Sequence, residues 1–250
     1  MGKKIIRVIA VVLIPVVCLY LLTLLLTPKY VNDIPEGSMI AEYYKSEKNN
    51  DVLILGDCEV YENISTVKMW EEYGITSYIR GSSEQLIWQS YYLLEDTLKH
   101  ETPKVVVLSM LAMSEADAKS EAYNRMTLDG MRWSKSKWNS IKESMTEKET
   151  MGSYIFPLLR YHSRWSELSS DDIKYMFNKP KVTSNGYLMQ VGVRPVTTVP
   201  KVSPLANYTF SDRNYEYLDK IKDLCNEKGI KLVLIKAPSI FPHWYDEWES

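Results

Sequence analysis

A cysteine follows a short apolar run in the stretch Val52-Leu-Ile-Leu-Gly56-Asp57-Cys58. The run predicts a buried β-strand that stops at Gly56 and delivers Asp57 and Cys58 into the turn beyond it. Turns after the strands of a parallel sheet are where α/β folds place catalytic groups, because the sheet fixes the backbone while the side chains point into the crevice outside it. A thiol at such a place can be a nucleophile, although only its thiolate reacts well.

Two interpretations of Cys58 remain open on the residues alone. Cysteine is among the residues most often buried, so Cys58 can be a small apolar side chain packed in a tight turn. As a nucleophile it would need help, because the neighbouring carboxylates of Asp57 and Glu59 raise the pKa of a thiol. We therefore expect an active Cys58 to depend on a basic partner, normally a histidine.

A second strand end carries a glycine. Residues 76–79 predict a strand that ends at Arg80-Gly81-Ser82-Ser83. Gly81 would let a backbone N–H approach a ligand closely, as in an oxyanion hole. The alternative is an ordinary strand–helix turn capped by Ser82 or Ser83.

Histidine is scarce, with three in the chain: His100, His162 and His243. They lie far apart and form no metal-ligand spacing with the cysteines, so we expect no metal site and no cofactor. His243 follows the last predicted strand, at the edge where a site would lie. It could serve as a base, but a surface histidine is the favoured interpretation.

Alternating strands and helices predict an α/β fold. Strands at residues 52–55, 76–79 and 105–108 are separated by helices at 66–73 and 84–100. This order is typical of a parallel sheet with helices on both faces.

The pattern breaks at about residue 112 and resumes with a helix at 212–228 and a strand at 231–235. We interpret residues 112–207 as a large, mostly helical insertion within an α/β domain that covers residues 51–250. Its helices are expected around 121–131, 136–145, 153–165 and 170–177. Because such a sheet would normally supply one more strand and helix, we expect the C-terminal part of the domain to be missing from this sequence.

The N-terminus predicts a membrane anchor, residues 1–28, followed by a juxtamembrane linker, residues 29–50. Residues 5–27 are apolar apart from Arg7. This stretch is long enough to cross a bilayer as a helix. The positive charges that precede this stretch predict the N-terminus inside and the remainder outside. A cleaved signal peptide is the competing interpretation, but no small-residue cleavage site follows the apolar stretch.

Composition excludes one class of partner. The chain has 30 Lys plus Arg against 32 Asp plus Glu, which gives no basic surface for nucleic acid. With 18 Tyr and 7 Trp it can fill the core of one globular domain.

Together these stretches resemble the SGNH/GDSL hydrolase superfamily, in particular its membrane-anchored bacterial members related to accessory proteins of alginate acetylation and teichoic-acid D-alanylation. The resemblance places Cys58 at the nucleophile position of the Gly-Asp-Ser block and Gly81 at the oxyanion glycine. It also rests on residues 70–78, 89–94, 121–126 and 236–239. It implies a flavodoxin-like three-layer fold, with Asp57 and Ser82 as supporting residues.

Two departures from the family pattern concern its third and fourth blocks. The asparagine expected after the third strand is missing from residues 109–114, and Asn124 is the candidate substitute. The Asp-x-x-His block is absent as well. The resemblance implies that the catalytic histidine and aspartate lie beyond residue 250.

The resemblance implies a membrane-anchored, extracytoplasmic esterase or O-acyltransferase that uses Cys58 on acyl esters of cell-surface glycans. Its location would be the bacterial cell membrane, as a single-pass protein in contact with lipid through residues 5–27. The alternative is a catalytically inactive accessory or binding module that partners a membrane-bound O-acyltransferase.

Overall fold

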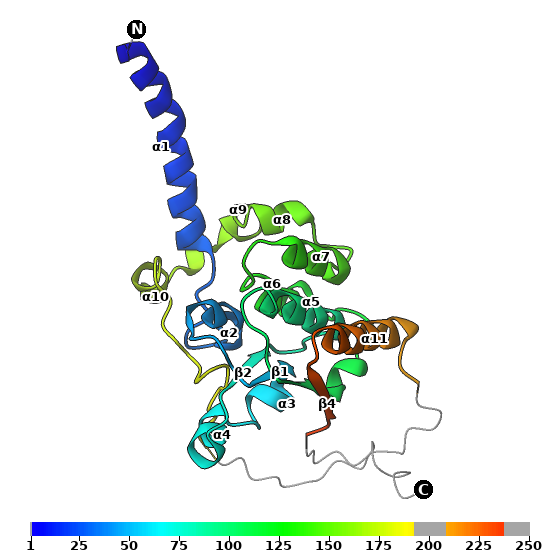
Figure 1. Cartoon of the computed structure of the whole chain (residues 1–250). Helices are drawn as coiled ribbons and strands as arrows, with labels where there is room; N and C mark the ends of the chain where they lie inside the picture. The colour runs from blue at the N-terminus through cyan, green and yellow to red at the C-terminus, as the bar shows by residue number, and fades with distance from the viewer. Residues whose placement is uncertain (1, 193–208, 238–250) are drawn as a thin grey trace, which may run out of the picture.

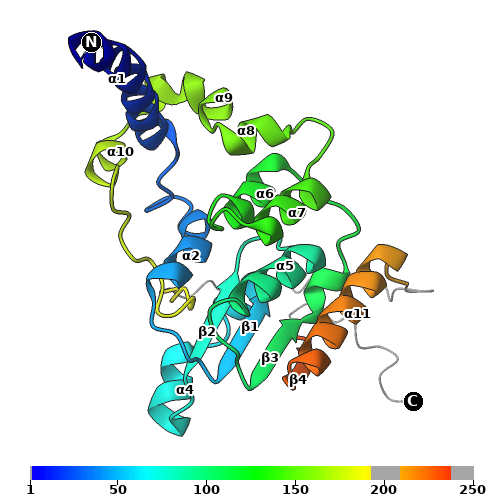
Figure 2. The same cartoon turned by 45° about the horizontal axis from the view of Figure 1, so that its top comes forward.

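The computed structural model describes residues 2–192 and 209–237, with side chains at residues 7, 9 and 11 onward. Its centre is one parallel sheet with the strand order β2-β1-β3-β4 (Figures 1 and 2). The strands are β1 (Val52–Gly56), β2 (Ser77–Gly81), β3 (Val105–Ser109) and β4 (Lys231–Ile235). The predicted α/β class, the parallel sheet and these four strands are therefore confirmed.

Helices cover both faces of the sheet because its strands are apolar on both sides. Leu53 and Leu55 of β1 face α5 (Ile87–Thr97) and α11 (Asp212–Glu227) in the larger core cluster. Val52 and Ile54 face the opposite way, toward α3 (Cys58–Tyr61) and α4 (Thr66–Tyr73).

Local signals in the sequence fix the ends of these helices. The Ser65 hydroxyl accepts a hydrogen bond from Lys68 N at 3.2 Å and caps α4. Gly74 ends the same helix at φ 66°. The chain turns at Gly229 after α11, as the sequence predicts.

The predicted insertion is helical and packs over α5. Its elements are η2 (Met110–Met113), α6 (Glu121–Leu128), α7 (Lys135–Ser144), α8 (Met151–Ile155), α9 (Leu158–Tyr161), η3 (His162–Glu167) and α10 (Ser170–Lys174). In Figures 1 and 2, α6 and α7 lie beyond α5, on the side away from the sheet. The single helix expected at 153–165 is wrong. Pro157 cannot continue the hydrogen bonding of a preceding helix, so the chain breaks there into α8, α9 and η3.

Residues 29–50 contain two short helices, α2 (Glu36–Glu42) and η1 (Tyr43–Lys45). Met39, Ile40 and Tyr43 are buried, and α2 packs against α6 and β2. The stretch after the first helix therefore belongs to the packed body of the domain.

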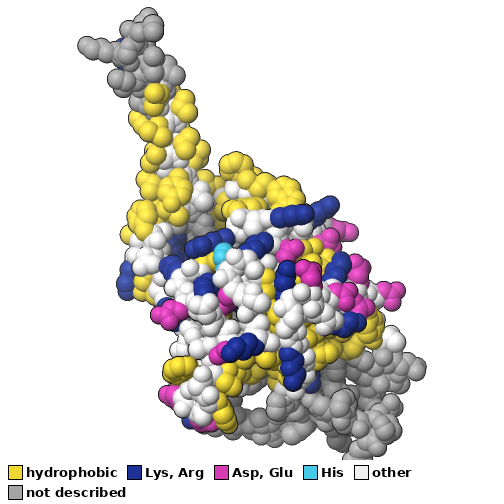
Figure 3. Space-filling view, viewed as in Figure 1, with side chains coloured by type: hydrophobic (Ala, Val, Ile, Leu, Met, Phe, Trp, Pro, Cys, Tyr) yellow, Lys and Arg dark blue, Asp and Glu magenta, His cyan; other side chains and the backbone are white. Residues whose placement is uncertain are grey.

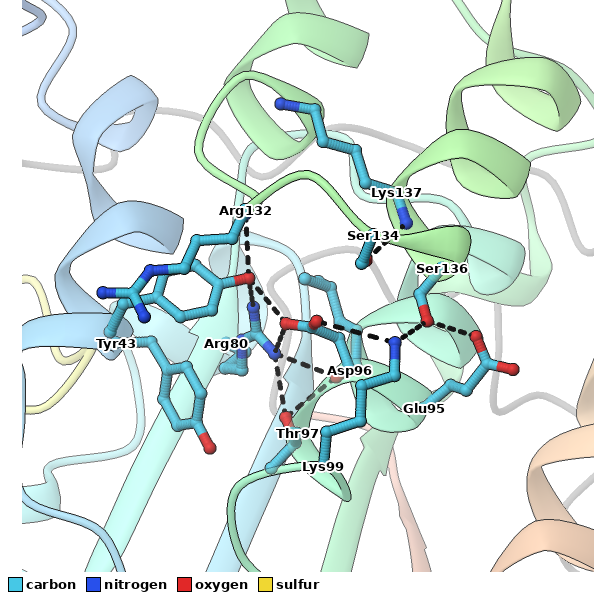
Figure 4. A network of polar contacts seen from close by, with 12 residues as sticks. Tyr43, Arg80, Glu95, Asp96, Thr97, Lys99, Arg132, Ser134, Ser136 and Lys137 are labelled. Carbon is cyan, nitrogen blue, oxygen red and sulfur yellow. Dashed lines mark hydrogen bonds and ion pairs between the residues drawn. The ribbon is translucent and has the colours of Figure 1, made fainter.

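A fully buried arginine joins the sheet to its helical cover (Figure 4). Arg80 of β2 donates to Leu93 O at 3.0 Å, to Asp96 Oδ2 at 3.1 Å and to Thr97 Oγ1 at 2.9 Å, all in α5. Its guanidinium also stacks on the ring of Tyr43, 4.3 Å from the centroid. Buried charges persist in proteins when they are paired and hydrogen-bonded in this way.

Residues 182–188 cover the outer edge of β2. Ile79 N donates to Asn185 O at 3.0 Å, and Leu188 N donates to Tyr61 O at 2.8 Å. Gly186 permits this close approach at φ 83°, because a β-carbon there would lie 2.0 Å from Ile79 O. Residues 182–188 are therefore hydrogen-bonded both to the edge strand β2 and to the last residue of α3.

The N-terminal helix α1 (Gly2–Leu26) is continuous over 25 residues and extends away from the domain (Figure 1). Its described apolar side chains from Val11 to Leu22 are exposed, and burial begins near Leu26. Over the part of the chain that the structure describes, no helix combines the length and apolarity needed to cross a bilayer.

The contact of Gly186 with β2 can be tested by paired substitutions. Gly74→Ala should lower the free energy of unfolding by about 1 kcal/mol, because only its positive φ is disfavoured and a β-carbon meets nothing within 4 Å. Gly186→Ala should cost about 2–4 kcal/mol, since a clash with the backbone of β2 adds to the same strain. Urea unfolding of the detergent-solubilised chain measures both, and equal losses would contradict the close approach.

Candidate functional site

The candidate site lies at the carboxyl ends of β1, β2 and β3. The chain leaves β1 for helices on one face of the sheet and passes from β3, through the insertion, to α11 on the other. In open α/β sheets, ligands bind outside the strand ends where connections diverge in this way. Gly56 and Ser109, the last residues of β1 and β3, mark that place.

Two glycines let these strand ends come together. A β-carbon at Gly56, where φ is 149°, would lie 2.6 Å from Cβ of Ser109. A β-carbon at Gly81 would lie 2.8 Å from Gly56 O and 3.1 Å from the ring of Tyr61. Any larger residue at either position would push the strand ends apart, so the site requires glycine at both.

Cys58 is the first residue of α3, directly beyond the end of β1, and its side chain is exposed. Asp57 caps this one-turn helix through a hydrogen bond from Glu59 N to Asp57 Oδ1, at 3.1 Å. The structure therefore brings Asp57, Cys58 and Gly81 together at one edge of the sheet.

The surroundings of Cys58 keep its thiol protonated at neutral pH. Partial burial and the nearby carboxylates, with Asp57 and Glu62 the strongest, raise the pKa of Cys58 to about 11. A helix of four residues offers only a small opposing dipole. The described site thus has the position of a nucleophile without the activation that a nucleophile needs.

Neither histidine in the described ranges reaches this edge. His100 lies between α5 and β3, at the opposite end of the strands, where it packs against Tyr43 and Tyr44. His162 lies in η3 and contacts Leu159 O. His243, the sequence-based candidate for a base, is outside the described residues.

Asp57 is the second group at this edge whose pKa is raised. Its carboxyl group is buried, and the loss of hydration raises its pKa to about 6, against the effect of the Glu59 N–H bond. Asp57 therefore exchanges its proton at a pH where most aspartates are already ionised.

Three further side chains converge at the same edge, and the sequence did not predict that they would meet. Ser109 Oγ donates to Glu59 Oε2 at 3.4 Å, and Lys236 forms an ion pair with Glu59 Oε1. The signal for this meeting is their position, since Ser109 ends β3, Lys236 follows β4 directly and Glu59 lies three residues past β1. Together they form a polar cluster suited to orienting hydroxyl groups of a substrate.

The other two sequence candidates point elsewhere. Ser82 is buried and bonds to Gln85 and Thr127. Asn124, also buried, donates to Ser144 O at 2.6 Å and to Glu149 Oε2 at 3.0 Å. Both side chains are occupied by contacts beneath the insertion, away from the thiol.

Residues 2–192 and 209–237 contain no group of three or more His, Cys, Asp or Glu side chains placed to hold a metal ion. Glu59 already has an ammonium partner in Lys236, and Asp57 caps a helix. The chemistry at this edge is that of a thiol among carboxylates.

The raised pKa of Asp57 predicts a pH-dependent gain in stability for Asp57→Asn. The folded chain holds this proton up to about pH 6, whereas the unfolded chain releases it near 3.8, so the wild type loses stability as pH rises through that window. Asparagine caps helices equally well and stays neutral. The variant should therefore gain up to about 3 kcal/mol over the wild type between pH 4 and 7.

The matched control is Asp51→Asn, because the hydrogen bonds from Lys104 and Thr76 lower the pKa of Asp51. Its ionised form contributes stability that is present at neutral pH and lost in acid, so the sign reverses and the variant should be less stable at pH 7. Urea unfolding at each pH measures both. A stability difference for Asp57→Asn that is flat from pH 4 to 7 would refute the assignment.

The raised pKa of Cys58 can be read from its alkylation rate. With a pKa of about 11, the reaction with iodoacetamide should rise about tenfold per pH unit from pH 7 to 9 without a plateau. Glu62→Gln should accelerate it roughly two- to tenfold by removing a nearby charge. Glu72→Gln on α4, whose carboxylate pairs with Lys68, is the control and should change nothing. Peptide mass spectrometry resolves each cysteine, and a plateau near pH 8.5 would disprove the shift.

Comparison of the chain with protein-family models, with curated proteins and with solved structures finds no match. The resemblance in the short blocks around Cys58 and Gly81 therefore stays a prediction. Function must be argued from the geometry of the strand ends.

Proposed function

We propose that the chain is a membrane-anchored, extracytoplasmic esterase or O-acyltransferase of the SGNH/GDSL type that acts on acyl esters of cell-surface glycans through Cys58. The observation that carries this proposal is the exposed thiol at the carboxyl end of β1, beside Gly81. A thiol in a merely structural role would be expected to pack inside, as Cys225 does.

The strand order supports the family assignment. The order β2-β1-β3-β4 is the beginning of the flavodoxin-like order 2-1-3-4-5, in which ligands bind beyond the ends of β1 and β3. The resemblance expects the nucleophile at the end of β1 and the oxyanion glycine at the end of β2. Cys58 and Gly81 occupy those places.

The proposed chemistry has two steps. The Cys58 thiolate attacks the acyl carbonyl, a C–S bond forms, the ester C–O bond breaks, and the alcohol leaves with a proton. The N–H groups of Cys58 and Gly81 would stabilise the oxyanion in between. Water or a sugar hydroxyl then attacks the thioester, which releases the acid or the transferred ester and returns the thiol.

A base must lower the barrier to the first step, because the carboxylates around Cys58 keep it protonated. The resemblance assigns this role to a histidine outside the described residues. The polar cluster of Glu59, Ser109 and Lys236 would bind hydroxyl groups of the glycan next to the thiol.

The raised pKa of Cys58 also favours a second candidate function. A thiol with a pKa of about 11 and no histidine in the described site suits a catalytically inactive module that partners a membrane-bound O-acyltransferase. In that role the strand ends would bind the glycan and leave the acyl transfer to the partner.

Both candidates place α1 in the bacterial cell membrane as a single-pass anchor. Support comes from the apolar sequence of residues 5–27 and from the exposed apolar side chains between Val11 and Leu22. The preceding basic residues favour an N-terminus inside and a domain outside.

Acyl-enzyme formation distinguishes the two candidates. The full-length chain in detergent, treated with p-nitrophenyl acetate, should acquire an acetyl group on Cys58, and Cys58→Ala should reduce that adduct by at least about tenfold. The control is Cys225→Ala, which removes a buried thiol of α11 and should leave the adduct unchanged. An undiminished adduct in Cys58→Ala would rule out the nucleophile.

Cellular acylation tests the accessory alternative. If surface-glycan acylation requires the protein but survives Cys58→Ala, the chain acts as a binding partner and not as the acyl carrier. Loss of acylation with Cys58→Ala and its retention with Cys225→Ala supports the enzyme.

A further inference from the structure

A set of exposed apolar side chains lies on one side of the place where α1 joins the domain. Ile155 and Phe156 at the end of α8, Leu159 of α9 and Trp165 of η3 project from the surface, and we refer to these four as the platform. Phe156 is 66 %, Leu159 63 % and Trp165 75 % exposed. Figure 3 shows the apolar surface over α8 and α9 beside the apolar rod of α1.

The end of α1 is bonded to Arg164, the residue before Trp165 of the platform, and to Lys29, which follows the helix. Arg164 Nη1 donates to Leu26 O at 2.6 Å, and Lys29 Nζ donates to Leu24 O at 2.6 Å. These cations satisfy carbonyls that the helix end leaves without partners. Since Trp165 follows Arg164, this bond places Trp165 at the level of the last turn of α1, and α9, which carries Leu159, also contacts α1.

That level is where a bilayer would change from hydrocarbon to headgroups. A span over residues 5–27 ends within one turn of Leu26, and the chain rises about 1.5 Å per helical residue. Tryptophan concentrates at this boundary, where its ring is apolar and its N–H remains hydrated. Trp165 therefore stands at the depth that this residue prefers.

Basic side chains on the helices around the last turn of α1 fit anionic headgroups. Arg160 is half-exposed beside Leu159 and forms an ion pair with Glu121 at 2.9 Å, and Lys174 of α10 is exposed. Asp172, the buried carboxylate nearby, is paired with Arg164. Glu167 is the exposed acid of η3. Long basic side chains next to aromatic and aliphatic ones are typical of surfaces that lie in the interface plane of a membrane.

We propose that the platform docks on the outer surface of the lipid bilayer, with Phe156, Leu159 and Trp165 inserted at the headgroup boundary. The inference rests on the membrane attachment proposed above for α1. It adds a second contact, which fixes the domain against the membrane and prevents it from pivoting freely about the end of the helix.

Fluorescence of the full-length chain in vesicles tests the docking. Serines replace Cys18, Cys58 and Cys225, and single cysteines labelled with the fluorophore NBD are introduced as Leu159→Cys, Tyr73→Cys or Leu19→Cys. Tyr73 is the matched control, because it is 72 % exposed on α4, at the far end of the domain from α8 and α9 in both views (Figures 1 and 2). Leu19 reports on α1 itself.

In vesicles of phosphatidylglycerol and phosphatidylcholine, the probe at 159 should emit at shorter wavelength than the probe at 73. Lipids with a nitroxide near the headgroup should quench it at least about twofold more than the probe at 73. Replacing phosphatidylglycerol by phosphatidylcholine should weaken this quenching, as should Arg160→Glu combined with Lys174→Glu.

If the probes at 159 and 73 show the same emission wavelength and the same quenching while the probe at 19 is in lipid, the docking is overturned and the anchor remains. A probe at 19 that stays in water would overturn the anchor and the docking with it. Shielding of 159 in native membranes but not in pure lipid vesicles would also overturn the proposal, because it would assign the platform to a membrane protein.

Discussion

The buried guanidinium of Arg80 constrains the rest of the structure. It lies on β2 directly before Gly81, yet its contacts all run to the helical cover, to Asp96 and Thr97 of α5 and to the ring of Tyr43. Removing one partner from a buried ion pair costs about 3–5 kcal/mol, because it leaves a charge without compensation. Arg80 therefore fixes β2 against α5, and through β2 it fixes where Gly81 meets the end of β1.

The charge of Arg80 is paired, whereas the charges at the candidate site are mostly negative. Lys236 pairs with Glu59, but the carboxylates of Asp57 and Glu62 still raise the pKa of the Cys58 thiol. Asp57 stabilises α3 as its cap while raising the pKa of the thiol that follows it. The same residue thus supports the geometry of a nucleophile and opposes its chemistry. A cation or proton acceptor brought to this edge would resolve the conflict, and a binding module would not need to resolve it.

The sequence was sufficient for the strands, the capped helices and the position of Cys58, because residues 52–58 carry a local signal in their apolar run and glycine stop. The sequence analysis predicted one helix across Pro157, whereas this proline ends the helical hydrogen bonding although the pattern on both sides of it is helical. The sequence also predicted that Arg80 belongs to the turn at the end of the strand, because no local pattern around a charged residue indicates that it is buried. The pairing of Glu59 with Lys236 joins residues 177 apart, and such contacts follow only from the order of the strands.

The insertion connects the strand ends to the platform through buried hydrogen bonds. Ser82 bonds to Thr127, Thr127 donates to Gln89 at 3.2 Å, and Gln89 donates to Asn124 at 3.1 Å. Asn124 then donates to Glu149, which precedes α8 and bonds to Tyr154 within it. Networks of this kind rigidify when every member is satisfied. The chain of bonds begins one residue past Gly81 and ends in α8, the helix that carries Ile155, so continuous hydrogen bonding links the end of β2 to the platform. A bilayer that holds the platform would therefore also set the orientation of Cys58 relative to the membrane surface.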